Sequence, residues 1–450
     1  MSDYVYMLES HLSPDQNRVV EEVQAAAAQA AANLFLTGGA MRDMLAGLRI
    51  RDLDFVVEGN ALKVAKSICE RTGAHTVSTD ENRKSAELVF TGGVTAQIAM
   101  ARQEKYSRNG AKPQVAQATI QEDLRGRDFT CNAIALSLNK ASRGLLLDPM
   151  NGLADIERHE LRAISTYGFY DDPSRLLRLV RFRVRLGFTV EERTRMQVAN
   201  AREAEVEKQI PPRVLGEELK RIGTEDSPSE ILKALDAEKL LVLFSPALEG
   251  PKLNLAGVVR FEKNCRLLPG DARSHAARFG PFMYVLTEKL GAKEKQALVK
   301  ATEMNKEEVD SWQKLEVRSK KLETLLHAGR VRKASHVYQI MVTAAPDEVL
   351  FELYHSTVKQ VQERMRNYYQ KYLPLLQEIT PEEWATVEGQ PDAAKSSKAR
   401  DAFIASRLDR KEKPPEVAEE PPPPTPPPAG PPPSNWTTPE TALARRGRQG

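Results

Sequence analysis

The chain has 450 residues, enough for roughly two to four domains, and its 65 Lys and Arg residues nearly balance its 62 Asp and Glu residues. The resulting net charge of +3 does not by itself demand a nucleic-acid partner. Three cysteines without metal or disulfide spacing exclude a disulfide scaffold, and no apolar run reaches the length of a membrane span, so we expect a soluble cytoplasmic protein with no membrane partner.

Residues up to about 100 predict a small mixed sheet with helices on one side. Ser13 and Gln16 have the spacing of a capping box, which would open an Ala-rich helix. Apolar runs bounded by glycines and polar residues then predict strands that alternate with helices. The expected helices cover 14–32, 40–48 and 61–71, and the expected strands cover 34–36, 53–57, 76–78, 86–90 and 94–100.

The junction between the first strand and the next helix carries two adjacent glycines, Gly38 and Gly39. Glycines at such a junction let backbone N–H groups approach an anion closely, and the helix N-terminus adds a partial positive charge. This pattern predicts a site for a phosphate group. Taken alone, however, a Gly-Gly turn before a helix is more often purely structural.

The second strand begins with two carboxylates, Asp52 and Asp54. Because side chains alternate along a strand, both face one side of the sheet, while Leu53 and Phe55 face the other. Two neighbouring carboxylates repel each other unless a cation lies between them, and Mg²⁺ prefers carboxylates together with substrate phosphates. A lone Asp-x-Asp is usually a solvated strand end or a turn, so only its combination with the glycine pair is specific.

The polar run 101–117 predicts a mobile loop, and a second candidate site follows it. Arg127 and Asp128 precede an apolar segment that leaves Asn132 on its other side. An arginine can clamp a triphosphate, and an aspartate or asparagine can bond a ribose hydroxyl. The alternative is a surface ion pair between Arg127 and Asp128, which would contribute about 0 to 1 kcal/mol.

Residues 170–188 predict an amphipathic helix with a cationic side. Asp172 followed by a proline is a typical helix start. Arg175, Arg178 and Arg181 recur at three-residue steps and so share one side of the helix. No row of acidic partners occurs at helical spacing beside them, so we expect these arginines to be available for a ligand rather than to form a solvated charged face.

These motifs occur in the order typical of one known family. The runs G-G-x-x-R-D, D-x-D-F-V-V, R-D-F-T-x-N-A and D-D-x-x-R resemble those of the class II tRNA nucleotidyltransferase and poly(A) polymerase family, within the polymerase-β-like nucleotidyltransferase superfamily. Arg102, Glu104 and Tyr106 match a further run of that family. The resemblance implies that Asp52 and Asp54 are catalytic and bind Mg²⁺. The nucleotide-binding residues that it implies are Gly38, Gly39, Arg42, Arg127, Asp128, Asn132, Asp172, Arg175, Arg178 and Arg181.

The implied activity is the template-independent addition of CMP and/or AMP, from CTP and ATP, to the 3′ end of tRNA, with release of pyrophosphate. Asp172 and Arg175 would read the base, because a carboxylate accepts from the exocyclic amino group of cytosine or adenine and a guanidinium donates to a ring acceptor. The same motifs serve enzymes that add CCA, only CC or only A, and poly(A) polymerases, so these alternatives stay open.

Two departures from the family pattern favour another alternative, a catalytically inactive RNA-binding relative. Gln97 stands where the family often has a third acidic residue, and Gly126 stands where an arginine is usual. A neutral amide binds a metal ion less strongly than a carboxylate does. Glu87 is an alternative source of the missing charge.

The predicted architecture is α+β: a mixed-sheet nucleotidyltransferase head at 1–148, followed by all-α parts. A helical neck at 149–245 would carry the base-reading motif, and a helical body and tail at 246–385 would bind RNA by shape and phosphate contact. Residues 386–450 are rich in proline, so we expect a disordered tail there, to which an unknown partner could bind.

Overall fold

The computed structural model describes residues 3–108, 111–270, 275–388 and 393–410. Contacts along the chain unite the residues up to Leu408 in one unit. No helix within these ranges has both the length and the apolar composition needed to cross a lipid bilayer.

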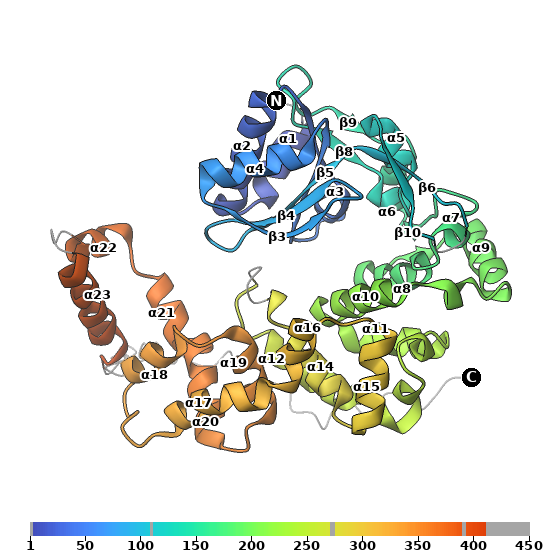
Figure 1. The fold of residues 1–450 in the computed structure, drawn as a ribbon. Coiled ribbons are helices and arrows are strands. Elements are labelled where there is room, and N and C mark those ends of the chain that lie inside the picture. The colour runs from blue at the N-terminus through green and yellow to red at the C-terminus, as the bar shows by residue number, and fades with distance from the viewer. Residues whose placement is uncertain (1–2, 109–110, 271–274, 389–392, 411–450) are drawn as a thin grey trace, which may run out of the picture. The chain divides into compact units, whose positions relative to one another are not determined.

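Seven strands form one mixed sheet in the order β3-β4-β5-β2-β1-β8-β9 (Figure 1). β2 and β5 run parallel, and all other neighbouring strands run antiparallel, so the predicted mixed sheet is confirmed. The strands are β1 (Asn33–Thr37), β2 (Leu53–Glu58), β3 (His75–Asp80), β4 (Ser85–Val89), β5 (Thr95–Met100), β8 (Ala135–Ser137) and β9 (Leu146–Leu147).

One face of this sheet is covered by helices α2 and α4, which lie beside each other and next to α1 (Figure 1). Leu53 and Phe55 of β2 are buried in that apolar core, whereas Asp54 between them is only half-buried. Asp54 therefore faces the opposite side of the sheet, as the alternation predicts. These helices are α1 (Asp3–His11), α2 (Pro14–Gln29) and α4 (Ala61–Thr72), and the capping box of Ser13 and Gln16 at the start of α2 is confirmed.

The run 101–117 is not the plain loop that we expected, because it contains a two-stranded antiparallel hairpin. The strands are β6 (Arg102–Lys105) and β7 (Gln114–Gln117). Their exposed, polar residues give no apolar alternation, which is the sequence signal for a strand. Helix α5 (Ile120–Arg125) follows directly, and the short 3₁₀ turn Thr130–Asn132 then leads into β8.

Helix α8 (Arg175–Leu186) packs into two apolar cores. Leu176 and Leu179 belong to the core of the sheet, whereas Leu177 and Val180 belong to the core of the helices that follow. An amphipathic helix that buries two neighbouring sides in this way is held firmly. The first turn of α8 therefore gives a fixed position to Arg175.

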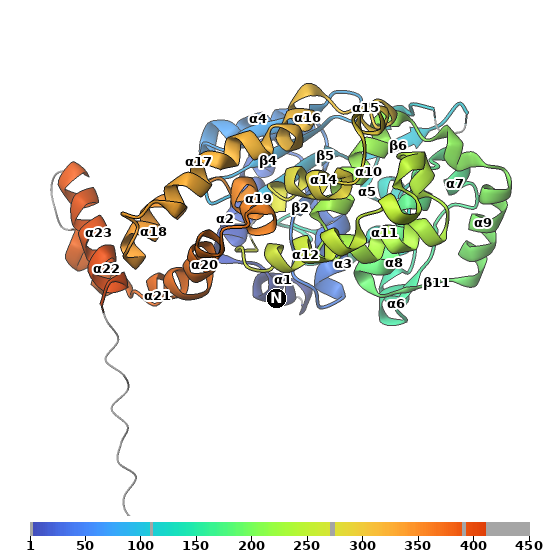
Figure 2. The same cartoon turned by 90° about the horizontal axis from the view of Figure 1, so that it is seen from below.

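The rest of the described chain is almost entirely helical, as predicted, and Figure 2 shows helices α17 to α20 gathered beside one another. The neck is not purely α, since Glu160–Leu161 and Thr189–Val190 pair as two short parallel strands, β10 and β11. The helices besides α8 are α3 (Gly38–Leu45), α6 (Gly152–Glu157), α7 (Gly168–Asp171), α9 (Glu192–Glu203), α10 (Pro212–Thr224), α11 (Pro228–Ala237), α12 (Leu255–Cys265), α14 (Phe279–Thr287), α15 (Ala292–Ala301), α16 (Lys306–Gln313), α17 (Leu315–His327), α18 (Ala334–Met341), α19 (Pro346–His355), α20 (Lys359–Asn367), α21 (Leu373–Gln377), α22 (Pro381–Glu388) and α23 (Ala393–Leu408).

The expected disorder over 386–450 is wrong at its beginning, because α23 lies there. The proline-rich residues 411–450 lie outside the described ranges, and the prediction for them stays untested.

Candidate active site

Asp54 lies against the backbone of the glycine pair. Its Oδ2 accepts a hydrogen bond of 2.9 Å from the backbone N–H of Gly39. Gly38 has φ +63°, and a Cβ atom there would come within 3.0 Å of the same carboxylate oxygen and within 3.2 Å of Nη1 of Arg127. A side chain at this position would both strain the backbone and fill the space between the two charged groups. The structure thus brings Asp54 and the two glycines together, as the sequence predicts.

The pair Asp52 and Asp54 fits a divalent cation. Burial, and then the neighbouring charge of Asp52, raise the pKa of Asp54 to about 6, although the N–H of Gly39 acts in the other direction. Asp52 is held by Thr95, whose hydroxyl donates to Oδ1 at 2.6 Å. Two carboxylates fixed in this way repel each other, and a hard cation that binds their oxygens would remove the repulsion.

An amide, Gln97, stands where the family resemblance implies a third acidic residue. Gln97 of β5 lies opposite Asp54 in the register of the sheet, and Glu87 of β4 lies opposite Gln97. Glu87 is thus two strands from Asp54, about 10 Å between backbones, and it accepts from the hydroxyl of Ser78 at 3.1 Å. Among the described residues, no three His, Cys, Asp or Glu side chains converge to hold a metal. Within the described residues, the aspartate pair is therefore the candidate for holding a metal ion.

Several hydrogen-bond partners orient the side chain of Arg127 toward the backbone of Gly38 and Gly39. Its Nε and Nη2 donate to one oxygen, Oδ2 of Asp123, at 3.1 and 2.9 Å. Nη2 also donates to the hydroxyl of Thr37 at 3.1 Å, and Nη1 donates to the backbone oxygen of Asn132 at 3.1 Å. A guanidinium held on three sides is preorganised to meet an anion with its remaining N–H group, the second one on Nη1.

Arg42 and Asn132 are buried beside this site. Nη1 of Arg42 donates to Oδ1 of Asn132 at 2.8 Å, and the other side of its guanidinium pairs with Asp43. Only 3% of Arg42 is exposed, so in this structure it orients Asn132 rather than facing an open surface. The structure thus brings these two predicted residues together, with Asn132 nearer to Arg127.

Asp128 and Arg178 form a close ion pair. Oδ2 of Asp128 lies 2.6 Å from Nη2 of Arg178, and its Oδ1 accepts from Nδ2 of Asn132 at 2.9 Å. Burial acts to raise the pKa of Asp128, but the charges of Arg178 and Arg175 hold it below its ordinary value. The carboxylate is therefore ionised, and the alternative of a surface ion pair between Asp128 and Arg127 is excluded.

The start of α8 lies against the segment that carries Arg127. Arg175 donates from Nη1 to the backbone oxygen of Arg127 and from Nη2 to that of Gly126, both at 3.2 Å. Asp172 is 3.8 Å from Nε of Arg175, and its Oδ1 accepts from the backbone N–H and the hydroxyl of Ser174. The predicted base-reading pair is thus assembled next to the predicted phosphate-binding arginine.

Arg181 does not reach this site. It is 5% exposed and pairs with Glu218 at 3.2 Å and with Glu225 at 3.1 Å. The expected row of arginines without acidic partners is also wrong further along, because Arg185 pairs with Asp43 at 2.5 Å. These acidic partners come from α3, from α10 and from the residue that follows α10, and helical spacing along one segment cannot show such partners. The structure does not support the predicted nucleotide contact of Arg181.

The comparisons with known proteins agree with this geometry. Residues 34–162, which contain the aspartate pair, the glycines and Arg127, match the family described as the poly A polymerase head domain. This part of the chain is similar to poly(A) polymerase head domains. The family resemblance expected from the motifs is confirmed.

Relatives of this head domain include enzymes that add different nucleotides. The chain is 38% identical over 199 residues to the A-adding tRNA nucleotidyltransferase of Aquifex aeolicus, a match that covers 44% of this chain and 24% of that protein. It is 35% identical over 203 residues to the CC-adding tRNA nucleotidyltransferase of Deinococcus radiodurans, covering 45% of this chain and 53% of that protein. The chain therefore spans about a quarter to a half of these curated relatives.

The fold extends beyond the head domain. A solved structure described as the apo form II of a CCA-adding enzyme aligns with 92% of this chain and 96% of its own, with a TM-score of 0.52 and 24% identity. At this identity the likeness shows the fold, and the predicted sequence of a mixed-sheet head followed by helical parts is confirmed.

Two residues of the head domain that sequence reasoning missed are Asp123 and Thr37, the partners of Arg127. Asp123 is four residues before Arg127, a spacing at which an ion pair is expected on a helix. That signal was present in the sequence. Thr37 gave no comparable signal, because it contacts Arg127 only through the fold.

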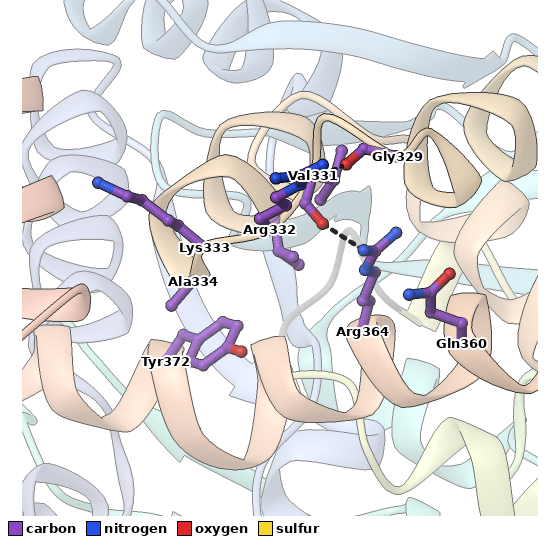
Figure 3. A pocket seen from close by; sticks show the side chains of 9 residues that line it. Gly329, Val331, Arg332, Lys333, Ala334, Gln360, Arg364 and Tyr372 are labelled. Carbon is purple, nitrogen blue, oxygen red and sulfur yellow. Dashed lines mark hydrogen bonds between the residues drawn. The ribbon is translucent and has the colours of Figure 1, made fainter. Parts of the chain in front are cut away.

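A basic pocket of about 420 Å³ lies in the helical part of the chain (Figure 3). Arg364 points into it from α20 and donates to the backbone oxygens of Leu326 and Val331. Arg332 and Lys333, which immediately precede α18, line the same pocket. Three basic residues, Arg332, Lys333 and Arg364, therefore lie around one hollow of the surface.

Proposed function

We propose that this chain is a template-independent tRNA nucleotidyltransferase, which adds CMP and/or AMP from CTP and ATP to the 3′ end of tRNA. The observation that carries the proposal is the position of Asp54, whose carboxylate is fixed against the Gly38–Gly39 backbone with Arg127 beside it. This arrangement supplies both a cation site and an anion site within one hydrogen-bonded cluster, which nucleotidyl transfer requires.

Asp52 and Asp54 are the residues that would hold the metal, for which we propose Mg²⁺. When bound, Mg²⁺ would lower the pKa of the RNA 3′-hydroxyl and offset the charge of the triphosphate. The hydroxyl oxygen attacks the α-phosphate in line, the bond to the β-phosphate breaks, and pyrophosphate leaves. Arg127, held by Asp123 and Thr37, would bind the triphosphate oxygens where the glycine backbone leaves room for them.

Two further pairs of side chains would orient the nucleoside. Asn132 and Asp128 are joined by a hydrogen bond of 2.9 Å and would bond the ribose hydroxyls. Asp172 and Arg175 would read the base edge, accepting from the exocyclic amino group of cytosine or adenine and donating to a ring acceptor. Guanine and uracil present the opposite pattern and would be refused. The hydrogen bonds from Arg175 to the backbone of Gly126 and Arg127 would fix the position of the base-binding pair relative to the phosphate site.

The tRNA itself would be bound largely by the helices that follow the head domain. Double-stranded RNA is recognised by its shape and its phosphates, and Lys and Arg groups supply these contacts. The pocket of Arg332, Lys333 and Arg364 is the basic surface that we propose for this role. A cytoplasmic location, in the compartment where tRNA is used, is part of the same proposal.

A second candidate, an RNA-binding protein without catalysis, is favoured by one observation: the amide of Gln97 faces Asp54 where a third carboxylate is common in the family. One assay of nucleotide incorporation separates the two functions. Purified protein is incubated with Mg²⁺ and labelled CTP or ATP, and with tRNAs that lack the whole CCA end, the final CA or only the final A. We expect incorporation on at least one of these tRNAs, whereas no incorporation on any would support the inactive relative.

The pattern of products then defines the enzyme. Addition of one A only, of two C only, or of all three nucleotides distinguishes A-adding, CC-adding and CCA-adding activity, and a long run of A indicates a poly(A) polymerase. Asp54→Ala should abolish incorporation. The matched control is Glu87→Gln, which removes a carboxylate on the same face of the sheet but two strands away and should leave the activity unchanged.

A further inference from the structure

The two carboxylate oxygens of Asp123 accept hydrogen bonds from two different parts of the chain, the side chain of Arg127 and the backbone of Arg102. Oδ2 accepts from both Nε and Nη2 of Arg127, as described above, and Oδ1 accepts from the backbone N–H of Arg102 at 3.1 Å. Arg102 begins β6, so one side chain joins the β6–β7 hairpin to the predicted phosphate-binding arginine. Asp123 is only 7% exposed, and its carboxylate is therefore shielded from water by the groups that it binds.

A structural role of Asp123 in its own helix does not account for this geometry. An acidic residue in the first turn of α5 interacts favourably with the helix dipole, but so does Glu122, which closes the capping box with Thr119 and stays exposed. An interaction with the helix dipole does not require that the carboxylate of Asp123 be buried, nor that it accept two hydrogen bonds from the guanidinium of Arg127. That arrangement fixes the direction of the arginine, because a guanidinium is planar and its donors have a fixed geometry.

The hairpin that Asp123 holds carries a second cluster of charges. Glu104 on β6 accepts from Nε of Arg83 at 2.9 Å, from Nε of Arg102 at 2.8 Å and from the hydroxyl of Tyr106 at 2.8 Å. Burial acts against it, but these two arginines hold the pKa of Glu104 at about 2, so the cluster stays ionised. The residue that begins β6 is thus fixed from both sides, by Glu104 through its side chain and by Asp123 through its backbone.

We propose that Asp123 is a positioning residue of the nucleotide site, which orients Arg127 toward the triphosphate and couples that orientation to the β6–β7 hairpin. The inference rests on the proposed function in so far as the ligand is CTP or ATP. Because the backbone oxygens of Gly126 and Arg127 receive Arg175, the same anchor also fixes the segment on which the predicted base reader rests.

The test measures nucleotide binding directly, by titration of the full chain with CTP and with ATP in the presence of Mg²⁺, together with the KM and kcat of transfer. Asp123→Asn keeps the size of the side chain and one acceptor for Arg102 but places an amide where Arg127 needs a carboxylate. We expect about tenfold weaker binding of CTP or ATP, as for the loss of a charged hydrogen bond, with the rise seen in KM for the nucleotide rather than in KM for tRNA. Glu122→Gln, one residue away, is the matched control and should bind as the wild type does.

A double-mutant cycle decides whether Asp123 acts through Arg127. If it does, Asp123→Asn adds no further loss in an Arg127→Ala background. Equal losses in both backgrounds would overturn the inference, and so would unchanged nucleotide binding in the single variant. If Asp123→Asn does not fold, Thr37→Val is the alternative variant, because it removes another hydrogen-bond acceptor of Arg127. We then expect the affinity for CTP or ATP to fall about threefold. Binding without transfer in the wild type would count against the proposed function while leaving this inference intact.

Discussion

Gln97 lies directly opposite Asp54, in the parallel pair formed by β5 and β2. Residues that pair in this way point to the same face of a sheet, so the amide shares a face with the carboxylate that rests on the Gly38–Gly39 backbone. Its neutrality leaves Asp52 and Asp54 as the charges that would hold a metal ion. The strength of metal binding is thus expected to depend on one position of β5.

Gln97→Glu is expected to bind Mg²⁺ more tightly. A third carboxylate at this distance adds about 1 kcal/mol of attraction to the ion, or about fivefold in affinity. The measurement is the Mg²⁺ concentration that gives half-maximal nucleotide transfer. Without metal the added charge should lower the melting temperature, and Mg²⁺ should restore it. An unchanged Mg²⁺ requirement would show that position 97 lies outside the metal site.

Asp54→Asn is expected to stabilise the metal-free protein at neutral and alkaline pH. The folded-state pKa of Asp54, about 6, lies above its ordinary value of 3.8. The folded state therefore holds this proton more tightly than the unfolded state does, and the stability that it contributes is lost as the pH rises through about 6. Urea unfolding in EDTA should show the variant to be more stable than the wild type at about pH 8, with the difference gone at about pH 4. A constant difference across this range would contradict the assignment.

Asp172→Ala combined with Arg175→Ala is expected to leave residual transfer with relaxed base choice. The phosphate site of Gly38, Gly39 and Arg127 stays in place in this variant, whereas the predicted donor and acceptor for the base are gone. Incorporation from each of CTP, ATP, GTP and UTP is the measurement. Because Asp172 also bonds Ser174 at the start of α8, the melting temperature of the variant must be determined alongside. An unchanged preference for C and A would refute the base-reading role.

The sequence was sufficient to place the aspartate pair. Alternation along a strand is a local property, so Asp52 and Asp54 on one face, with Leu53 and Phe55 on the other, followed from the order of the residues alone. The glycine junction is local too, because the positive φ of Gly38 is a property of one residue and its neighbours. Both belong to motifs in which a few consecutive residues determine the geometry.

The partners of the arginines could not be predicted in the same way. Arg181 and Arg185 are neutralised by Glu218, Glu225 and Asp43, which lie far away along the chain and meet the arginines only after α8 has packed. Helix capping was also not fully predictable from the sequence. The residues from Ser227 onward match a capping box, but the side chain of Ser227 makes no capping hydrogen bond in the structure. Tertiary packing decides such pairs, and a single sequence does not report it.

Arg332→Glu combined with Lys333→Glu is expected to weaken tRNA binding without affecting the binding of CTP. Both residues line the basic pocket beside α20, and phosphate contacts of RNA depend on such charges. The affinity for tRNA should fall, and its dependence on salt should decrease by about one unit of slope per lost contact. The matched control reverses the same charges on α17, at the exposed Lys320 and Lys321, outside the pocket. Equal effects of the two double variants would show that the pocket has no special part in RNA binding.

Arg181→Met should destabilise the protein and leave nucleotide binding unchanged. The guanidinium is buried between Glu218 and Glu225, so its removal takes one counter-charge from each of two buried carboxylates. Glu218 keeps Arg221, and Glu225 keeps Arg51 and Arg185. Breaking a buried ion pair in this way costs about 3 to 5 kcal/mol of the free energy of unfolding. Urea unfolding measures the loss, and titration with CTP measures the affinity.

Arg127→Met provides the contrast, with weaker CTP binding and a smaller loss of stability expected. A further variant, Arg181→Met with Glu218→Gln, should recover part of the lost stability, because it removes the charge of one of the two buried carboxylates that Arg181 neutralises. If Arg181→Met instead kept its stability and lost affinity for CTP, Arg181 would contact the triphosphate as the family motif implies, in a conformation that differs from this structure.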